Sequence, residues 1–297
     1  MLEHVACDNC GKKDDTFLFK TKDHCHGLPG EFNIVKCGNC GLVYLNPRPH
    51  MDDIGTYYPG EYAPHREMAG SKNVRLQQRL LNLFVGFHGG ELRTLWRFAP
   101  GKILDVGCGG GMYMKVMKDK GWDVCGVDAS TQATQRAQSL GLDNVFTGEL
   151  QEAGFPDAHF DVVLMRHSLE HMPHPSRTLA EVHRILKQDG HVLIVTPNLG
   201  SIEAKIFKEH WYQIDAPRHF YFLDRNTIGE LLKKHGFSIV RSSQSSRPFS
   251  SFSWSMIYAM KSRLLRSMLD NAAFHIFLYL LFWPLHRSTS LVILARK

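Results

Sequence analysis

The sequence lacks the features that define several broad classes of protein. It contains no internal repeat and no low-complexity tract, and its 43% hydrophobic and 22% charged residues are ordinary for a globular chain. Disordered, collagen-like and disulfide-dense architectures are therefore excluded as descriptions of the whole chain. With 297 residues, the length predicts roughly two domains.

Long apolar segments are also missing. The longest strongly apolar run, 272–285, is interrupted by His275 and is shorter than the about 20 residues that a spanning helix needs. The first 15 residues contain no apolar stretch of the kind found in secretory signals. We therefore expect a cytoplasmic protein without an ordinary transmembrane helix.

Cysteine is scarce, but its placement is informative. Of the seven cysteines, four form two Cys-x-x-Cys pairs, each followed by glycine, and this favours metal binding over disulfides. The four thiolates suit tetrahedral, structural zinc. The spacing between the pairs is longer than usual, and a residue of 24–26 could replace one ligand. The predicted ligands are Cys7, Cys10, Cys37 and Cys40.

The central part of the chain has an alternating pattern. Short β-rich runs are separated by amphipathic stretches, which is typical of βαβ units and a parallel sheet. The predicted strands are 102–106, 123–127, 160–165, 191–196, 237–241 and 290–295, and the predicted helices are 112–120, 130–140, 176–187 and 226–235. A further helical stretch is predicted for 73–98, broken at Gly89 and Gly90.

The most informative stretch is the glycine-rich turn at 107–111, which follows an apolar strand and precedes a helix. Glycines there allow a sharp turn and a close approach of a ligand to the backbone. Asp105 lies two residues before the turn, and Asp128 ends the next strand, where an acid can accept hydrogen bonds from both hydroxyls of a ribose. The glycines read G-x-G-x-G rather than the dinucleotide spacing.

These blocks, together with 160–163, 169–171 and 186–193, resemble the class I S-adenosylmethionine-dependent methyltransferases. The resemblance implies a Rossmann-like α/β fold with a seven-stranded, mostly parallel sheet, and S-adenosylmethionine as cofactor. It places Asp105, Gly107, Gly109 and Gly111 around the methionine part of the cofactor and Asp128 at its ribose. Glu149 occupies the place where the family often has an aspartate near the adenine amine.

Histidines follow the strand predicted at 160–165, at the sheet edge where open α/β folds bind ligands. Methyl transfer to a hydroxyl needs a proton acceptor, and histidine is the usual one near neutral pH. We therefore predict His167 and His171 as candidate bases. His171 has a structural alternative, since the family's Leu-Glu-His element often orders this loop.

A second cluster, 210–220, follows the strand predicted at 191–196. It offers His219 as a further candidate base and Arg218 as an anion clamp. The alternative is that Arg218 only pairs with an acid.

The segment 247–287 carries five basic residues against one acidic residue, within a chain whose net charge is +6. In the family that this sequence resembles, the last two strands form an antiparallel hairpin, and here this segment separates them. Connections of that length are usually functional. Its second half is apolar on all sides, and basic flanks with tryptophan and phenylalanine favour an interfacial helical hairpin at a membrane surface. A lid or dimer helix packed on protein is the alternative.

The sequence thus predicts a zinc-ribbon-like module at 1–48, a helical linker or cap at 49–99 and a methyltransferase domain at 100–297, with the helical insert before the last strand. The predicted acceptor is a small molecule, a sugar or a lipid-linked glycan. An RNA methyltransferase is the enzymatic alternative, less favoured because no basic cluster is interleaved with aromatics in the cysteine module. A non-catalytic, cofactor-binding scaffold is the alternative of another class.

Overall fold

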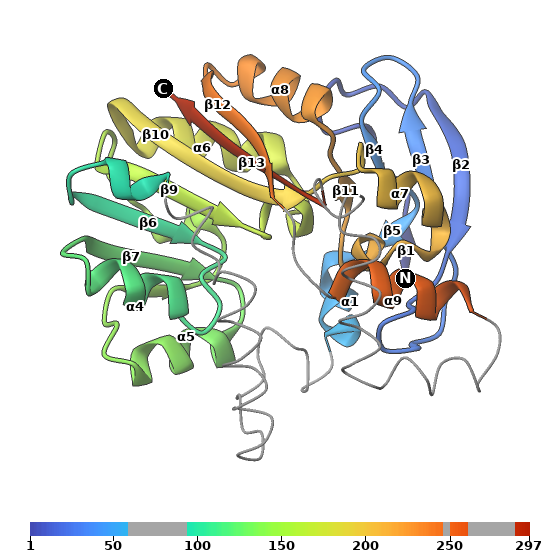
Figure 1. The fold of residues 1–297 in the computed structure, drawn as a ribbon, viewed down its shortest axis with the longest axis horizontal. Helices are drawn as coiled ribbons and strands as arrows, with labels where there is room; N and C mark the ends of the chain where they lie inside the picture. The colour runs from blue at the N-terminus through green and yellow to red at the C-terminus, as the bar shows by residue number, and fades with distance from the viewer. Residues whose placement is uncertain (59–93, 246–249, 261–288) are drawn as a thin grey trace.

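The structure is a computed structural model that describes residues 1–58, 94–245, 250–260 and 289–297. Most of the helix predicted at 73–98 and most of the insert at 247–287 lie outside these residues, and the described end of that helix forms a short 3-10 helix, η3 (Leu95–Arg97), instead. Figure 1 shows the seven-stranded sheet on one side of the molecule and the strands of the N-terminal module on the other.

The larger sheet has the strand order β12-β13-β10-β9-β6-β7-β8. Adjacent strands of this sheet are parallel, except that β13 runs antiparallel to both of its neighbours, β10 and β12. The strands are β6 (Lys102–Val106), β7 (Asp123–Asp128), β8 (Val145–Thr147), β9 (Phe160–Arg166), β10 (Leu186–Pro197), β12 (Ser238–Ser245) and β13 (Ser290–Arg296). This arrangement confirms the predicted fold class.

Three strands of the larger sheet differ clearly from the expectation, among them β12, which runs to Ser245 rather than to residue 241. The sequence analysis missed β8, a three-residue strand at the sheet edge whose exposed side chains give no apolar pattern. It also started β10 at residue 191, whereas the strand begins at Leu186, because the preceding helix ends at Ile185 rather than at 187.

Alternation along the strands gives the sheet two apolar faces. One face, which includes Leu104, packs with α6 (Pro175–Ile185) and α8 (Arg225–Lys234). The other, which includes Ile103, packs with α4 (Met112–Lys118) and α5 (Thr131–Ser139). The strand ends and the loops that follow them therefore remain available for a site.

Local side chains fix where these helices begin. Ser130 caps α5 by accepting a hydrogen bond from the backbone of Ala133 at 3.3 Å. Asp224 and Thr227 form a reciprocal capping box at the start of α8. The cap of α6 comes from a distant part of the chain, since the carboxylate of Asp8 accepts a 2.7 Å hydrogen bond from the backbone of Ser176.

The N-terminal module forms a four-stranded sheet of order β11-β4-β3-β2. Its strands are β2 (Asp15–Thr21), β3 (Phe32–Cys37), β4 (Val43–Leu45) and β11 (Tyr221–Phe222), and the short pair β1 (Leu2–Glu3) and β5 (Arg48–Pro49) lies beside it. The fourth strand, β11, comes from the segment after β10 and pairs antiparallel with β4. A stretch of the part that contains the larger sheet thus completes the sheet of the N-terminal module.

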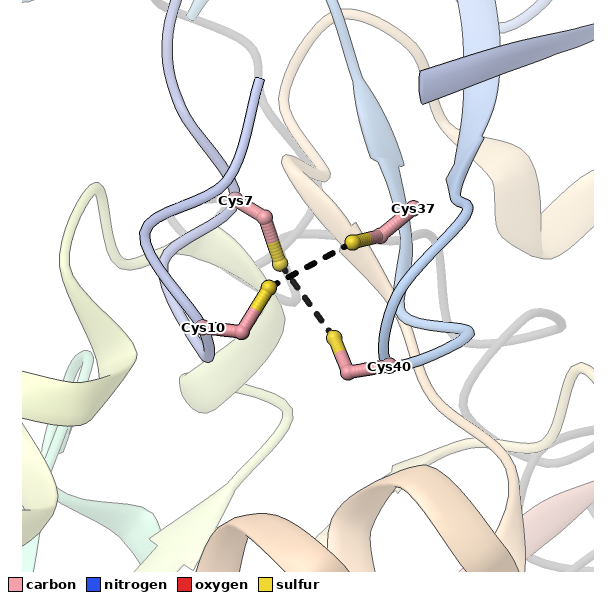
Figure 2. Close-up of side chains that lie close together, drawn as sticks. All are labelled: Cys7, Cys10, Cys37 and Cys40. Carbon is pink, nitrogen blue, oxygen red and sulfur yellow. Dashed lines mark hydrogen bonds between the residues drawn. The ribbon is translucent and has the colours of Figure 1, made fainter. Parts of the chain in front are cut away.

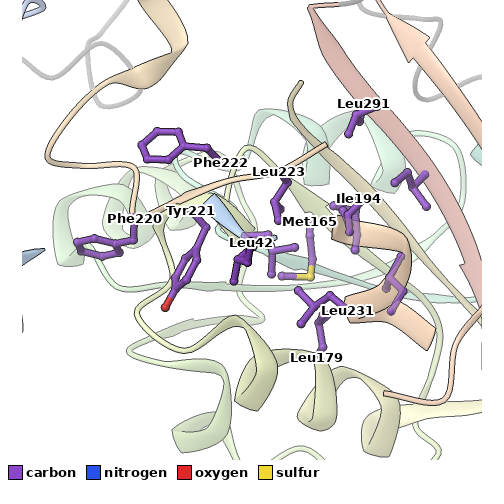
Figure 3. Packing of buried hydrophobic residues seen from close by; sticks show 14 of the residues in the cluster. Leu42, Met165, Leu179, Ile194, Phe220, Tyr221, Phe222, Leu223, Leu231 and Leu291 are labelled. Atoms are coloured by element: carbon purple, nitrogen blue, oxygen red, sulfur yellow. The ribbon is translucent and has the colours of Figure 1, made fainter. Parts of the chain in front are cut away.

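A single apolar cluster connects the two parts. Leu42 of the N-terminal module packs in it with Met165 of β9 and Leu231 of α8, as Figure 3 shows. Phe220, Tyr221 and Phe222 belong to the same cluster and are almost fully buried. The module is therefore joined to the larger sheet through a continuous core rather than through a linker alone.

The described start of the insert is helix α9 (Ser250–Ala259), which packs on protein. The Ser255 hydroxyl oxygen accepts a 2.9 Å hydrogen bond from the backbone of Tyr212, and Phe252 meets the ring of Phe207 edge to face. Within the described residues, no helix combines the length and apolarity needed to cross a membrane. The interfacial hairpin predicted for 272–285 lies outside the described residues.

Helix α9 covers an acid whose titration is expected to affect stability. Glu203, in α7 (Ile202–Phe207), is 1% exposed, and burial raises its pKa from 4.5 to about 7. Because the folded pKa lies above the unfolded one, the free energy of unfolding falls as pH rises from 4.5 to 7 and stays reduced above that range. Glu203→Gln should raise the free energy of unfolding at pH 8 by up to about 3 kcal/mol and leave it unchanged near pH 4.5.

Urea denaturation at several pH values measures this effect. The control variant Glu230→Gln changes an exposed acid on α8 and should follow the wild-type pH dependence. If the free energy of unfolding of Glu203→Gln depends on pH between 4.5 and 7 as steeply as that of the wild type, the buried carboxyl is not the cause of the pH dependence.

Candidate active site and cysteine cluster

The glycine turn has the conformation that the sequence predicted. Gly107, Gly109 and Gly111 have φ values of +77°, +52° and +77°, a region that other residues adopt rarely. A Cβ at Gly111 would lie 2.5 Å from Leu142, so that glycine is needed for packing. A Cβ at Gly109 would meet nothing within 4 Å, so the turn is open at this position.

Asp128 lies at the end of β7, directly beside this turn. Its carboxylate accepts hydrogen bonds from the backbone of Gly109 at 2.8 Å and of Ser130 at 2.9 Å. The backbone of Gly148 donates to the carbonyl of Asp128 at 3.0 Å, which brings the loop that holds Glu149 to the same edge. Glu149 is exposed and caps the short helix η4 (Leu150–Ala153).

Asp105 is buried at the end of β6, with 5% of its surface exposed. Burial raises its pKa to about 7, while the nearby guanidinium of Arg166 opposes that rise and Asp128 adds to it. Arg166 itself lies over the ring of Tyr113, with its central carbon 3.5 Å from the ring centroid. The two predicted acids thus differ in their surroundings, one buried and one held by backbone amides.

The loop after β9 touches the glycine turn. A Cβ at Gly107 would lie 2.5 Å from the Cβ of Ser168, so the two backbones approach closely there. His167 has a φ of +49°, and its Nδ1 lies 3.2 Å from the Oε1 of Glu170. Glu170 is fully buried, and its Oε2 accepts a 3.0 Å hydrogen bond from the Thr196 hydroxyl. His167 and Glu170 therefore form a histidine–carboxylate pair next to the turn.

The other two predicted histidines meet at the same place. The rings of His171 and His219 lie edge to face with centroids 4.4 Å apart. The Nδ1 of His171 lies 3.0 Å from the carbonyl of Arg218, and the Nδ1 of His219 lies 2.9 Å from the carbonyl of Gln213. Because a carbonyl only accepts, each Nδ1 carries the proton and each Nε2 the lone pair. Tyr58 contributes its hydroxyl 3.1 Å from the Nδ1 of His171.

Burial and the neighbouring His219 lower the pKa of His171 to about 3. His171 is therefore neutral at physiological pH and is a weak proton acceptor there. The structure thus brings the three predicted histidines together near the glycine turn.

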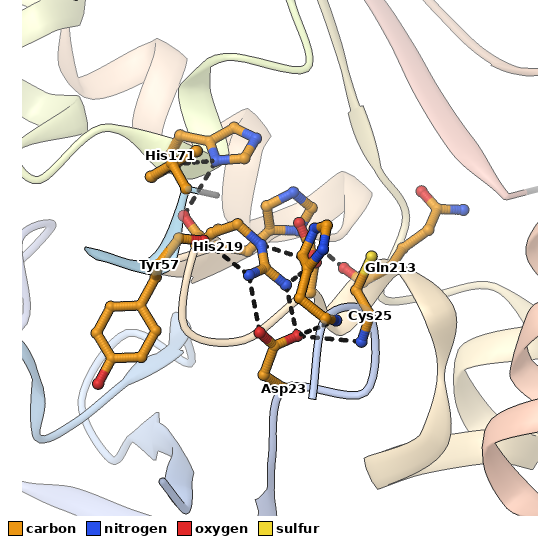
Figure 4. Close-up of polar contacts among 10 residues, drawn as sticks. Asp23, Cys25, Tyr57, His171, Gln213 and His219 are labelled. Atoms are coloured by element: carbon orange, nitrogen blue, oxygen red, sulfur yellow. Dashed lines mark hydrogen bonds and ion pairs between the residues drawn. The ribbon is translucent and has the colours of Figure 1, made fainter. Parts of the chain in front are cut away.

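Arg218 does not have the role that the sequence analysis gave it. Its guanidinium is fully buried, and it donates to both carboxylate oxygens of Asp23 at 2.8 and 3.0 Å, to Asp215 at 2.6 and 3.1 Å, and to the carbonyl of Tyr57 at 3.0 Å. Five N–H groups thereby have protein acceptors, so an anion clamp is wrong and the acid-pairing alternative is correct. Figure 4 shows Asp23 and His171 within this network of polar contacts.

Three residues of this site were not selected from the sequence. Glu170 stands between candidate histidines, and an acid in that position could have been chosen as their partner. Tyr58 and Asp23 gave no such signal, because they reach the site only through the docking of the N-terminal module.

The four predicted metal ligands also converge, as Figure 2 shows. The Sγ atoms of Cys7 and Cys40 lie 3.4 Å apart and those of Cys10 and Cys37 lie 3.5 Å apart, and all four Sγ atoms are within 4.8 Å of one another. Tetrahedral zinc with bonds of about 2.3 Å requires sulfur separations of about 3.8 Å. The thiols are free rather than disulfide-bonded, so the donor set fits zinc.

Each cysteine pair sits in the same kind of turn. In the first, the backbone of Gly11 donates to the carbonyl of Cys7 at 2.7 Å, and in the second Gly41 donates to Cys37 at 3.0 Å. Both glycines have positive φ, +72° and +75°. Residues 24–26 belong to a separate loop beside Arg218, and none of them belongs to the cysteine cluster among the described residues.

Comparison with known proteins places the chain among methyltransferases. A family model described as a methyltransferase domain matches residues 78–242. An uncharacterised protein of Methanocaldococcus jannaschii is 28% identical over 155 residues, 52% of this chain and 73% of that protein. The ubiquinone biosynthesis O-methyltransferase of Photobacterium profundum is 37% identical over 103 residues, which are 33% of this chain and 44% of that enzyme. The chain thus spans less than half the length of this second relative.

Solved structures share the fold at low sequence identity. An S-adenosylmethionine-dependent methyltransferase of Thermotoga maritima superimposes with a TM-score of 0.51 at 18% identity, over 75% of this chain and 96% of that one. A phosphoethanolamine N-methyltransferase of Haemonchus contortus, solved with S-adenosylmethionine, gives a TM-score of 0.50 at 22% identity, over 71% of this chain and 53% of that one. The family match, the seven-stranded sheet and the glycine turn together show that this chain belongs to the class I S-adenosylmethionine-dependent methyltransferases.

Proposed function

We propose that this protein transfers the methyl group of S-adenosylmethionine to a hydroxyl group of a small-molecule acceptor. The observation that carries the proposal is the contact between Gly107 of the cofactor turn and Ser168 of the histidine loop. Because of this contact, the residues that would bind the methyl donor lie beside the residues that would accept the acceptor's proton. Such positioning is the main contribution that a protein can make to this reaction.

The residues present fit the cofactor. Gly109 leaves open space where a side chain would stand, and Asp128 and Asp105 offer carboxylates at the ends of adjacent strands. We assign Asp105, Gly107, Gly109 and Gly111 to the methionine part, Asp128 to the ribose and Glu149 to the adenine. When bound, the cofactor supplies an electrophilic methyl group on its sulfonium.

His167 is the proton acceptor that we propose. Its Nδ1 faces the buried carboxylate of Glu170, which holds that proton and leaves the lone pair on Nε2. The acceptor oxygen forms a bond to the methyl carbon as the carbon–sulfur bond breaks, its proton passes to His167, and S-adenosylhomocysteine leaves. His171 and His219, whose rings are 4.4 Å apart, are the other side chains that we propose contact the acceptor.

Calorimetric titration with S-adenosylmethionine tests the cofactor assignment. Asp128→Ala should weaken binding about 100-fold or more, because the carboxylate's paired hydrogen bonds to a ribose are lost and a charged acceptor contributes more than a neutral one. Asp123→Ala, at the exposed start of the same strand, is the control and should bind as the wild type does. Equal binding by the Asp128 variant would contradict the assignment.

The raised pKa of Asp105 predicts a pH dependence of cofactor affinity. Its carboxyl, with a pKa of about 7, becomes charged as pH rises from 6 to 8, and only the charged form attracts the cofactor's ammonium group. Affinity should therefore increase with pH by up to about tenfold per unit below the pKa and level off above it. Asp105→Asn should lose this increase, which separates it from the titration of the cofactor's own amine. Parallel slopes for the two proteins would refute the role of Asp105.

Only the sequence and the similarity to known methyltransferases indicate which class of acceptor the protein methylates. The O-methyltransferase relatives support a hydroxyl acceptor, and sugars and lipid-linked glycans are the first classes to test. Transfer of labelled methyl groups to a fractionated cell extract identifies the acceptor. Label in the small-molecule, glycan or lipid fraction supports the proposal, whereas label in RNA supports the alternative. Flotation with anionic liposomes tests membrane contact through 247–287.

We also propose that the cysteine cluster binds structural zinc and that the boundaries of the chain's parts are those given by the sequence, 1–48, 49–99 and 100–297. Four thiolates with no fifth donor among the described residues favour a closed, structural site over a catalytic one. Metal analysis of the purified protein tests the zinc.

A further inference from the structure

We propose that Glu170, His171 and His219 bind a divalent first-row transition-metal ion. One ligand atom from each residue lies within 4.8 Å of the others, and Glu170 and His219 are buried while His171 is partly buried. A metal about 2.1 Å from each donor needs them roughly 3 to 3.5 Å apart, so a small contraction suffices. The ion's role in methyl transfer rests on the proposed function, but its binding does not.

The hydrogen bonds around the two histidines orient them as metal ligands. Each ring donates its Nδ1 proton to a backbone carbonyl, that of Arg218 for His171 and that of Gln213 for His219. Metal-binding histidines almost always use their second nitrogen in this way, because it fixes both the tautomer and the ring orientation. Both rings therefore carry on Nε2 the lone pair that a metal requires, before any metal arrives.

The carboxylate is held as firmly as the rings. Thr196 donates to one oxygen of Glu170 at 3.0 Å, and His167 contacts the other at 3.2 Å. An ionised carboxylate has about four lone-pair positions and can accept several partners at once, a metal ion among them. A divalent ion would offset part of the cost of burying this negative charge.

The donor set indicates which ions the site would take. Two imidazoles and one carboxylate suit manganese, iron, cobalt or zinc better than magnesium or calcium, which prefer oxygen ligands. Three protein ligands also leave coordination positions open for oxygens of the acceptor. A hydroxyl bound to such an ion loses its proton more readily. The acceptor class is then one that presents two neighbouring oxygens, such as a catechol or a vicinal diol.

Manganese(II) distinguishes this site from the cysteine cluster for two reasons. Thiolates prefer softer ions, and the four thiolates are already bound to zinc when the protein carries one zinc per chain. We expect wild-type protein that carries one equivalent of zinc per chain, held by the four thiolates, to bind about one further equivalent of Mn²⁺, counted by electron paramagnetic resonance of the free ion. Glu170→Gln and His219→Gln should weaken this binding at least tenfold. His174→Gln, a half-exposed histidine of the same loop, is the matched control and should bind normally.

Variants at buried positions can lose stability, so a second measurement uses the wild type. Bound Mn²⁺ should broaden the imidazole carbon-proton signals of His171 and His219 strongly and that of His159, which lies beyond the opposite end of β9, far less. Absence of a further equivalent, or broadening only at other histidines, overturns the site. Mn²⁺ binding without any methyl transfer would leave the metal site standing and remove the proposed function, and transfer without Mn²⁺ binding would do the reverse.

Discussion

Cys37→Ser is expected to release zinc and to abolish methyl transfer, although Cys37 lies in the N-terminal module. Structural zinc contributes about 10–16 kcal/mol of apparent binding energy in small zinc-dependent folds, and that energy is available only to the folded state. Serine is not a zinc thiolate ligand, so three donors remain. Cys37 is 1% exposed at the end of β3, and the loss of the metal there loosens the core of the module.

The effect should reach the candidate active site through β11. Tyr221 and Phe222 pair with Tyr44 and Val43 of β4, and they follow His219 and Phe220 directly. When β4 is no longer held, the segment that carries His219 loses its partner strand. We therefore expect the rate of methyl transfer to decrease by at least the same factor as the fraction of protein in which the module is folded.

Zinc analysis, thermal unfolding and labelled-methyl transfer measure the three consequences separately. Cys25→Ser is the matched control, because Cys25 is exposed and stands outside the cluster of four thiols. It should retain zinc, stability and activity. A Cys37→Ser protein that keeps its activity without zinc would show that the module does not need metal.

The local part of this structure could be predicted because its signals are short-range. The central strands of the larger sheet, such as β6 and β9, are largely apolar runs, as strands buried on both faces require. The glycine turn and Asp128 are separated by fewer than 25 residues and meet through one strand–helix–strand unit. Such a unit brings its chemistry to one sheet edge in nearly every fold that contains it, so residue types and spacing were sufficient.

The part that could not be predicted depends on long-range docking. Arg218 and Asp23 are 195 residues apart in the chain, and no periodicity links them. The sequence analysis assigned Arg218 to an anion because its cluster follows a sheet strand, where ligands collect. What decided otherwise was β11, a two-residue strand too short to be recognised, which places this cluster against the N-terminal module.

Arg218→Met is expected to destabilise the protein by about 3–5 kcal/mol, because it leaves two acids facing each other in the interior without their cation. Asp23 is 2% exposed and Asp215 is only partly exposed. The guanidinium holds the pKa of both carboxyls below their ordinary value, against the effect of burial. Arg218→Lys keeps the charge but offers three donors instead of five, and it should cost less than methionine does.

The control is Arg184→Met. Arg184 also pairs with two acids, Glu181 and Asp157, but its side chain is 39% exposed. Surface ion pairs contribute about 0–1 kcal/mol, so this variant should unfold close to the wild-type urea concentration. If Arg218→Met and Arg184→Met destabilise the protein equally, burial of the Arg218–Asp23 ion pair is not the cause of the large loss of stability.

Activity gives a second readout, which a purely structural role of Arg218 would not change. The carbonyl of Arg218 fixes the tautomer of His171, and His219 is the next residue. Below the unfolding transition, where the folded fraction is complete, Arg218→Met should still lower kcat because the two histidines lose their fixed orientation. Cofactor affinity should be unchanged, since Gly109 and Asp128 belong to a different part of the sheet edge. Loss of stability with unchanged kcat would limit the buried ion pairs to holding the N-terminal module in place.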